Sequence, residues 1–238
     1  DGTEFVGVAE DGSTLRGTDF IGLELTNEPE AAEAVLFHIQ EVHASSDPEI
    51  LLYDVYYSFD DETWSPLCGV DGLGNDVLSI PVLGSWNVAA DKVEDPQHIT
   101  FACQGYAIAH CVEWGYKPWK LATRCDGGGT CWETSMAIVH QACTRMVRAD
   151  YCGDGRSFTR DGTLINIYDF AGIEVDTEAW DVEAEWDAGG ARCLDQRRIT
   201  GTSNVPRCER DLALDDCGDP LHFDEGTLLM TEAAPKRE

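Results

Sequence analysis

Ten cysteines in a chain of 238 residues constrain this fold more than any other feature of the sequence. Their number is even and no CxxC pair repeats, so the pattern favours disulfides in an oxidising compartment over zinc binding. The closest pair, Cys125 and Cys131, encloses Asp-Gly-Gly-Gly-Thr, which closes a small loop more naturally than it holds a metal. The sequence leaves the pairing open. The disulfide candidates are Cys68, Cys103, Cys111, Cys125, Cys131, Cys143, Cys152, Cys193, Cys208 and Cys217.

The location follows from the same argument. No apolar run reaches the ~18 residues that a membrane span needs. The chain shows no signal peptide and starts at Asp1-Gly2-Thr3. We therefore expect an extracellular or cell-surface protein whose leader has already been removed.

Acidic residues outnumber basic ones by 45 to 16, which gives a formal net charge of −29. Residues 1–63 hold 16 acids against Arg16 alone, residues 64–171 hold 12 against 8, and residues 172–238 hold 17 against 7. Nucleic acid and anionic membranes are poor partners for such a chain, because phosphate binding needs clustered Lys and Arg. The acidic surface is typical of a soluble exterior, and divalent cation binding is the sharper alternative.

The N-terminal region, residues 1–63, is expected to be β-structure. The segment at residues 2–7 recurs at residues 17–22, and Asp11-Gly12 between them predicts a hairpin. Residues 34–43 and 50–58 are rich in β-forming side chains and predict two more strands.

Residues 64–238 form the second predicted region. Short β segments at 64–68 and 80–86 precede two helices, at about 101–114 and 131–151. Thr100 and Thr130 are the expected N-caps, and Glu133 completes a capping box with Thr130.

Gly153 is expected to supply a left-handed stop after the second helix. A hairpin over residues 157–168, a strand at 180–186 and a loop-rich stretch from Cys193 follow. The expected fold class is α+β: a single disulfide-rich domain in which antiparallel β regions flank a disulfide-linked helix pair.

The run from His140 to Asp154 concentrates polar chemistry within the second helix and its exit. His140 lies on the apolar stripe of that helix, with Met136, Cys143, Val147 and Tyr151. His110 lies on the stripe of the first helix, so the two imidazoles could meet. The alternative is that each is a core histidine with an ordinary partner. With Asp150, His140 forms the candidate catalytic pair of a hydrolase.

Arg145 and Arg148 lie on the flank of the helix and could clamp a carboxylate ligand. Pairing with nearby aspartates is the structural alternative. Asp154 and Asp161 bracket a turn-rich segment and are weak candidates for calcium, the one cofactor considered. The sequence holds no GxSxG, P-loop or HExxH motif.

Residues Arg148-Ala-Asp-Tyr-Cys-Gly-Asp-Gly155 resemble the signature of the ADYC domain, a family of secreted or surface proteins of myxobacteria and their relatives. The likeness covers roughly residues 60–200. It implies a bacterial extracytoplasmic location and supplies no catalytic residue, since no activity is established for the family. Further segments that resemble the family are residues 100–103, 111–119, 140–145, 159–163 and 183–186.

A fainter likeness is to secreted phospholipases A2, which join two helices by disulfides and set a histidine beside an aspartate. The contiguous His-Asp of that family is missing here. We expect a secreted or surface-displayed structural or interaction protein whose partner is itself or another extracellular protein. An extracellular hydrolase and a cation- or small-ligand-binding module are the alternatives.

Overall fold

Antiparallel β-structure dominates the chain, with two α-helices and five disulfides in the part that the structure describes. This part of the computed structural model comprises residues 2–27, 34–126, 128–177, 179–199, 205–208, 214–218, 223 and 226–235. Two compact units are present. The first unit comprises Asp1–Ser85 and Glu94–His110, and the second comprises Trp86–Val93 and Cys111–Glu238. The boundary expected after residue 63 lies inside the first unit.

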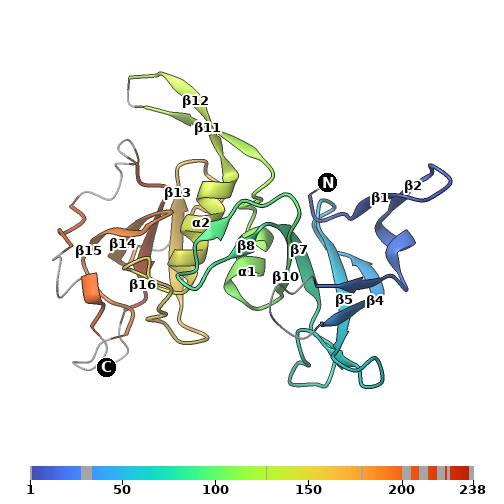
Figure 1. Cartoon of the computed structure of the whole chain (residues 1–238). Coiled ribbons are helices and arrows are strands. Elements are labelled where there is room, and N and C mark those ends of the chain that lie inside the picture. The colour runs from blue at the N-terminus through green and yellow to red at the C-terminus, as the bar shows by residue number, and fades with distance from the viewer. Residues whose placement is uncertain are drawn as a thin grey trace. The chain divides into compact units, whose positions relative to one another are not determined.

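One antiparallel sheet forms the centre of the first unit, with the strand order β10-β7-β5-β4-β3 and with β6 paired to β5 (Figure 1). The two strands predicted at 34–43 and 50–58 are confirmed as β4 and β5. The strands of this sheet are β3 (Glu24–Thr26), β4 (Leu36–Ala44), β5 (Leu51–Ser58), β6 (Ser65–Pro66), β7 (Ser79–Leu83) and β10 (Ile99–Cys103).

The core of this unit lies on one face of the sheet. Ile39, Tyr53 and Val55 are buried there. Phe5 packs edge-on against Tyr53 and Phe101, with ring centroids 5.0 and 5.9 Å apart. Aromatic side chains from outside the sheet thus close the core, and the Cys68–Cys103 disulfide ties the unit together.

A short hairpin, β1 (Val6–Val8) with β2 (Thr14–Arg16), precedes the sheet and turns around the predicted Asp11-Gly12. The second copy of the repeat does not form a strand, and this part of the prediction is wrong. Residues Gly17–Phe20 form the 3-10 helix η1 instead. Gly17 has φ +46°, and the Asp19 carboxylate accepts the backbone N–H of Arg16, so the chain turns where a strand was expected.

The first α-helix is much shorter than predicted. Residues 99–103 pair with β7 as strand β10, because Ile99 and Phe101 are β-formers whose partners in β7 are available. Gly105, with φ +82°, then turns the chain into α1 (Ala107–Glu113). Thr100 is therefore a strand residue and not a helix cap.

The second α-helix also begins later than predicted. Residues 131–135 pair with residues 121–125, so that Cys125 lies opposite Cys131. This pairing forms the hairpin β11 (Leu121–Cys125) and β12 (Cys131–Ser135), and the capping box at Thr130 is wrong. Helix α2 (Met136–Val147) starts after Ser135, whose side chain accepts the N–H of Ala137.

The second unit is built on a sheet of strand order β13-β16-β14-β15, against which α2 packs on β14, β15 and β16 (Figure 1). The Cys111–Cys143 disulfide links α1 to α2. The strand predicted at 180–186 is confirmed as β14. The strands are β13 (Ile165–Asp169), β14 (Asp181–Asp187), β15 (Gly190–Leu194) and β16 (Leu229–Ala233), and a small hairpin adds β8 (Ser85–Trp86) and β9 (Lys92–Val93).

The hairpin predicted over residues 157–168 is wrong. The turn at Asp161-Gly162 is present, but residues 156–160 form no strand. Strand β13 pairs with β16, more than sixty residues later, since this long-range partner completes the sheet. Among the helices of the described ranges, none is both long and apolar enough to cross a membrane.

Candidate functional site

The run from His140 to Asp154 spans the second half of α2 and the loop that follows it. Its predicted stripe is confirmed as interior: Met136, His140, Cys143 and Tyr151 are buried, and Val147 is half-buried. These side chains join the hydrophobic core of the second unit. The segment that carries the most polar chemistry in the sequence is therefore part of the interior.

Arg145 is the largest departure from the expected arrangement. It was placed on the flank of the helix, but its side chain is 1% exposed. Its Nη1 donates to Asp150 Oδ2 at 2.6 Å, and its guanidinium also bonds to Asp91 and to the Ala89 carbonyl. Asp91 and Ala89 belong to residues 86–93, a segment that we call the strap. The strap covers the guanidinium, which explains why the Arg145 side chain is buried.

The strap is attached to α2 by a second side chain. The Gln141 amide accepts the backbone N–H of Lys92 at 2.9 Å and donates to the Ala90 carbonyl at 2.8 Å. These contacts were not predicted, because Gln141 lies 51 and 49 positions from Ala90 and Lys92 in the sequence.

Asp150 organises the loop after α2. Besides Arg145, its carboxylate accepts the backbone N–H groups of Asp154 at 3.1 Å and Gly155 at 2.9 Å. Ala149, just before it, adopts φ +49° and is fully buried. The three hydrogen bonds to Asp150 all hold the chain in place.

Tyr151 belongs to a second buried polar network. Its hydroxyl donates to Glu183 at 2.7 Å, and its ring stacks on Trp186 with centroids 5.3 Å apart. Arg198 forms an ion pair with Glu183 at 2.8 Å, and Thr231 donates to the same carboxylate. Burial, then the negative charge of Glu183, raises the pKa of the Tyr151 hydroxyl, which therefore stays protonated and donates.

Arg198 also closes the C-terminal end of α2. Its guanidinium donates to the carbonyls of Met146 and Val147 at 2.6 and 3.0 Å. Carbonyls in the last turn of a helix lack intrahelical partners, and Arg198 supplies donors to both of these. The Met146 carbonyl also accepts the backbone N–H of Ala149 at 2.9 Å. Sequence reasoning missed both Glu183 and Arg198, because they lie 32 and 47 positions from Tyr151 in the sequence.

The remaining letters of the signature are structural as well. Cys152 forms a disulfide with Cys208. Gly153 has φ +63°, so its predicted left-handed conformation is confirmed, although α2 ends earlier, at Val147. A Cβ at this position would lie 1.8 Å from the carbonyl oxygen of Gly189, so the site admits no side chain.

The arginine and calcium candidates are less enclosed. The Arg148 guanidinium donates to the Gly155 carbonyl. Asp154 Oδ2 lies 3.7 Å from Arg156 Nε, and Asp161 is exposed. In the described ranges, no group of three or more His, Cys, Asp and Glu side chains is arranged to hold a metal ion. A ligand role for Arg148 stays a prediction.

The hydrolase alternative rests on His140 and Asp150. Both side chains are 0% exposed, and His140 packs edge-on against Trp86 with ring centroids 6.0 Å apart. His110 belongs to the first unit, so the meeting of the two imidazoles stays a prediction. A catalytic histidine and aspartate must be reached by the ester substrate. The burial of His140 and Asp150 therefore favours the alternative that His140 is a core histidine.

All ten cysteine candidates form disulfides, which confirms that part of the sequence analysis. The pairs are Cys68–Cys103, Cys111–Cys143, Cys125–Cys131, Cys152–Cys208 and Cys193–Cys217.

No curated protein and no solved structure is similar enough to the chain to count as a relative. A family model described as the ADYC domain matches residues 17–200 and so reaches much further toward the N-terminus than the likeness expected from about residue 60. With this match covering most of its length, and with Ala149-Asp150-Tyr151-Cys152 at the centre of its second unit, the chain belongs to the ADYC domain family.

Proposed function

We propose that this chain is a secreted or surface-displayed, disulfide-stabilised structural or interaction protein of an extracellular assembly. The observation that carries the proposal is the pairing of all ten cysteines, in both units. Disulfides of this density form and persist in oxidising compartments. The net charge of −29 supports the same location and argues against nucleic acid as a partner.

The burial of the signature directs the search for the contact surface elsewhere. Arg145 and Asp150 use their polar groups on each other, on residues 86–93 and on the loop after α2, and the Tyr151 hydroxyl donates to Glu183. A partner is therefore expected to contact exposed parts of the chain. The part of the second unit that best fits this role is the hairpin Leu121–Ser135, which we call the arm.

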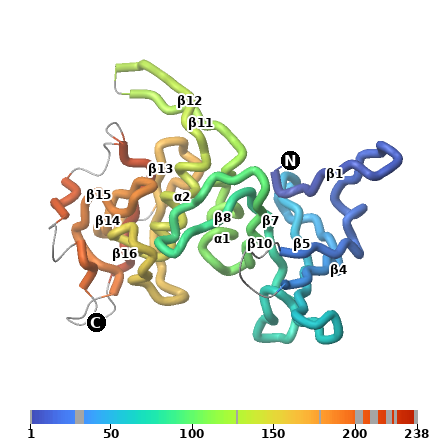
Figure 2. Tube along the Cα trace, viewed as in Figure 1, coloured from blue at the N-terminus to red at the C-terminus, as the bar shows by residue number. Residues whose placement is uncertain are grey.

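The arm stands away from the other elements of the second unit (Figure 2). Neither β11 nor β12 pairs with a further strand in the described part of the chain, so the outer backbone edges of both strands remain unpaired with another strand. Leu121 is 60% exposed. Such an edge can add a strand from another protein.

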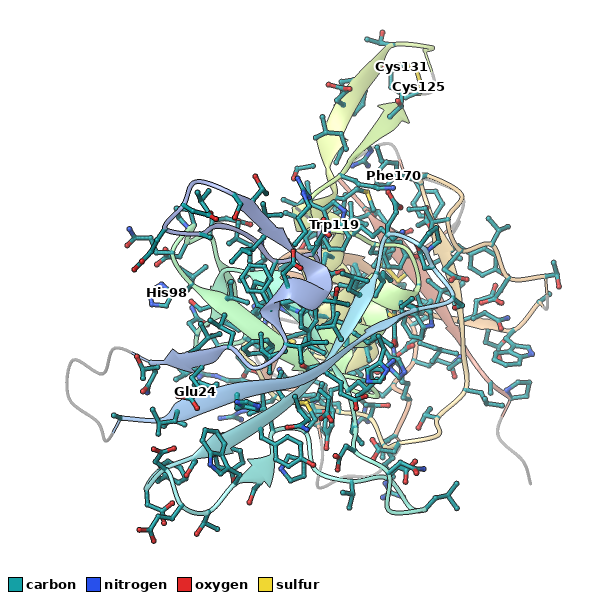
Figure 3. The ribbon with its side chains drawn as sticks, turned by 90° about the vertical axis from the view of Figure 1, so that its right-hand side faces the viewer. Glu24, His98, Trp119, Cys125, Cys131 and Phe170 are labelled. Atoms are coloured by element: carbon teal, nitrogen blue, oxygen red, sulfur yellow. A yellow bond between two sulfur atoms is a disulfide. The ribbon has the colours of Figure 1, made fainter. Side chains whose placement is uncertain are left out.

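Two features keep the arm in shape. At its tip, Cys125 and Cys131 form a disulfide (Figure 3). Next to this disulfide in β11, Arg124 is buried, its guanidinium carbon lies 5.2 Å from the ring centroid of Phe170, and it donates to the Thr227 carbonyl at 2.9 Å. An isolated two-stranded hairpin is marginally stable in water, so these two anchors make it a fixed surface.

Light scattering on the full chain tests the proposal. We expect the chain to associate with itself or to co-elute with a surface partner from the source cells. Self-association should strengthen as the salt concentration rises, because salt screens the repulsion between acidic copies. Leu121→Lys is expected to weaken the association, whereas Leu73→Lys, at an 89% exposed leucine of the first unit, leaves it unchanged. A strict monomer at every salt concentration with no cell-surface association would sink the proposal.

A further inference from the structure

The arm has two backbone edges, and the hydrogen bonds at its two ends show which groups face outward. At the root, the Met136 N–H donates to the Lys120 carbonyl at 2.9 Å. At the tip, the Asp126 N–H donates to the Thr130 carbonyl at 2.9 Å. Since hydrogen-bonded pairs alternate along an antiparallel ladder, the even-numbered residues of β11 point their backbone groups at β12. The N–H and C=O groups of the odd-numbered residues therefore point outward.

Three residues of β11, Leu121, Thr123 and Cys125, thus carry the outward backbone groups of this edge. Among the described residues, none outside the hairpin forms a hydrogen bond with these groups. All three residues are exposed, and the arm projects from the rest of its unit (Figure 1). A strand of another chain can therefore reach this edge and extend the hairpin.

The arm is electrically balanced in a very acidic chain. Residues 120–135 hold two basic and two acidic residues, so their net charge is zero, whereas the whole chain carries −29. Two copies of so acidic a chain repel each other in general, and they repel least where the local charge is balanced. The arm is therefore a favourable place for one copy to contact another.

The edge of β11 is also complementary to itself. When two β11 strands pair antiparallel over their full length, Thr123 lies opposite Thr123 of the second copy, and Leu121 lies opposite its Cys125. These are the outward-facing residues, so this register forms the hydrogen bonds that the edge lacks. The same register sets Lys120 opposite Asp126 of the second copy, and two-fold symmetry repeats the pair. Opposite charges across paired strands stabilise the pairing.

The edge of β12 does not have this complementarity. By the same alternation, its outward residues are Cys131, Glu133 and Ser135. Full-length antiparallel pairing of two β12 strands sets Glu133 opposite Glu133 of the second copy, and like charges directly opposite each other are destabilising. The charge pattern therefore favours β11 over β12 for a contact between two copies.

We infer that β11 pairs antiparallel with β11 of a second copy of this chain, in the register that sets Thr123 opposite itself. The two arms then form one four-stranded sheet, which is more stable than an isolated two-stranded hairpin. This inference rests on the proposed role of the arm as a contact surface and names the partner and the edge that it uses.

Sedimentation velocity on charge-reversed variants tests the register. Lys120→Glu and Asp126→Lys each set like charges opposite each other, so each is expected to weaken self-association by about tenfold. In an equimolar mixture of the two variants, the heterodimer regains both opposite-charge pairs, so the mixture should associate as the wild type does. Arg156→Glu, at a 69% exposed arginine of the same unit, changes the net charge as Lys120→Glu does and should leave association unchanged.

A second measurement keeps the test decisive if Asp126→Lys does not fold, since the Asp126 carboxylate accepts the N–H groups of Gly128 and Thr130. Amide hydrogen exchange of the wild-type chain is followed by NMR at low and at high protein concentration. Association should protect the outward N–H groups of β11 and leave those of β12 as they are.

Three results would overturn the inference: a monomer at every concentration, a dimer whose outward β11 amides stay unprotected, or equal association of Lys120→Glu and the wild type. Protection of β11 only when another protein is added would give the edge a different occupant and would also overturn it. Self-association through another surface leaves the proposed function standing, whereas a monomer that contacts no surface partner contradicts both.

Discussion

Arg145 and Asp150 form an ion pair in the interior of the second unit, with Nη1 2.6 Å from Oδ2 and side-chain exposures of 1% and 0%. Their spacing of five does not bring two side chains together on one helix. The pair exists because α2 ends at Val147 and the loop turns back, with Ala149 in a left-handed conformation. Each charge is then stabilised by the other. Removing either charge leaves the other buried in a low-dielectric interior without that partner.

Gly153 provides a sharp test of how closely the loop packs. A Cβ at Gly153 would lie 1.8 Å from the carbonyl oxygen of Gly189, and the backbone there cannot move without disturbing the Asp150 hydrogen bonds. We expect Gly153→Ala to lower the free energy of unfolding by more than about 3 kcal/mol, through the clash and the positive φ together. Urea unfolding followed by tryptophan fluorescence measures it.

Gly129 is the matched control for that substitution. It also has a positive φ, of +84°, but a Cβ there meets nothing within 4 Å. Gly129→Ala should cost about 1 kcal/mol, the strain alone. If both alanine variants lost the same stability, close packing at Gly153 would not be the cause.

The disulfides should differ in their resistance to reduction. Cys125 and Cys131 are exposed at the tip of the arm, whereas Cys111 and Cys143 are 0% exposed. Attack by a thiolate needs access to the sulfur, so the arm disulfide should open first in graded reductant. Alkylation and mass spectrometry identify the order. Simultaneous reduction of both pairs at the lowest reductant concentration would contradict the described burial.

The pH dependence of stability follows from Asp54. Burial, then Asp76 and Glu41, raises its pKa above the ordinary value of 3.8, so the folded chain holds this proton more tightly than the unfolded chain. Its contribution is fully present below the unfolded pKa and is lost as pH rises through the raised folded value. Stability from this group therefore falls as pH rises above about 4.

Asp54→Asn isolates that contribution, since other acids titrate alike in both proteins. At pH 7, the free energy of unfolding of the variant should be at least as large as that of the wild type. As pH falls to about 3.5, the free energy of unfolding of the wild type should rise relative to that of the variant. Urea midpoints at the two pH values measure the difference. A stability difference that is constant across this range would show that Asp54 carries no shifted pKa.

Local patterns predicted the parts of the fold that depend on neighbours in the sequence. Strands β4, β5 and β14 have clear β-former patterns and form where they were expected. The two predicted helices included residues 101–103 and 131–135, which are strands, because the helical spacing at Cys103 and the capping pattern at Thr130 do not reveal a distant partner strand.

The candidate site shows the same limit. The apolar stripe of His140, Cys143 and Tyr151 follows from helical spacing and was predicted. Pairing of Arg145 with a nearby aspartate was the structural alternative, and Asp150 is such a partner. Its second partner Asp91 and the Tyr151 partner Glu183 were not predicted, because they lie 54 and 32 positions away in the sequence. Only the fold brings a strap and a strand against α2, and this turns an expected exposed arginine into an interior one.

The central claim is that the Ala-Asp-Tyr-Cys signature is the buried framework of the second unit, and urea unfolding of Asp150→Asn tests it most directly. We expect the free energy of unfolding to fall by about 3–5 kcal/mol, since Arg145 keeps its charge in the interior and loses the buried one of its two carboxylate partners. Asp154→Asn, four residues on in the same loop, should stay within about 0.5 kcal/mol of the wild type. An Asp150→Asn chain that unfolds at the wild-type urea concentration would contradict the claim.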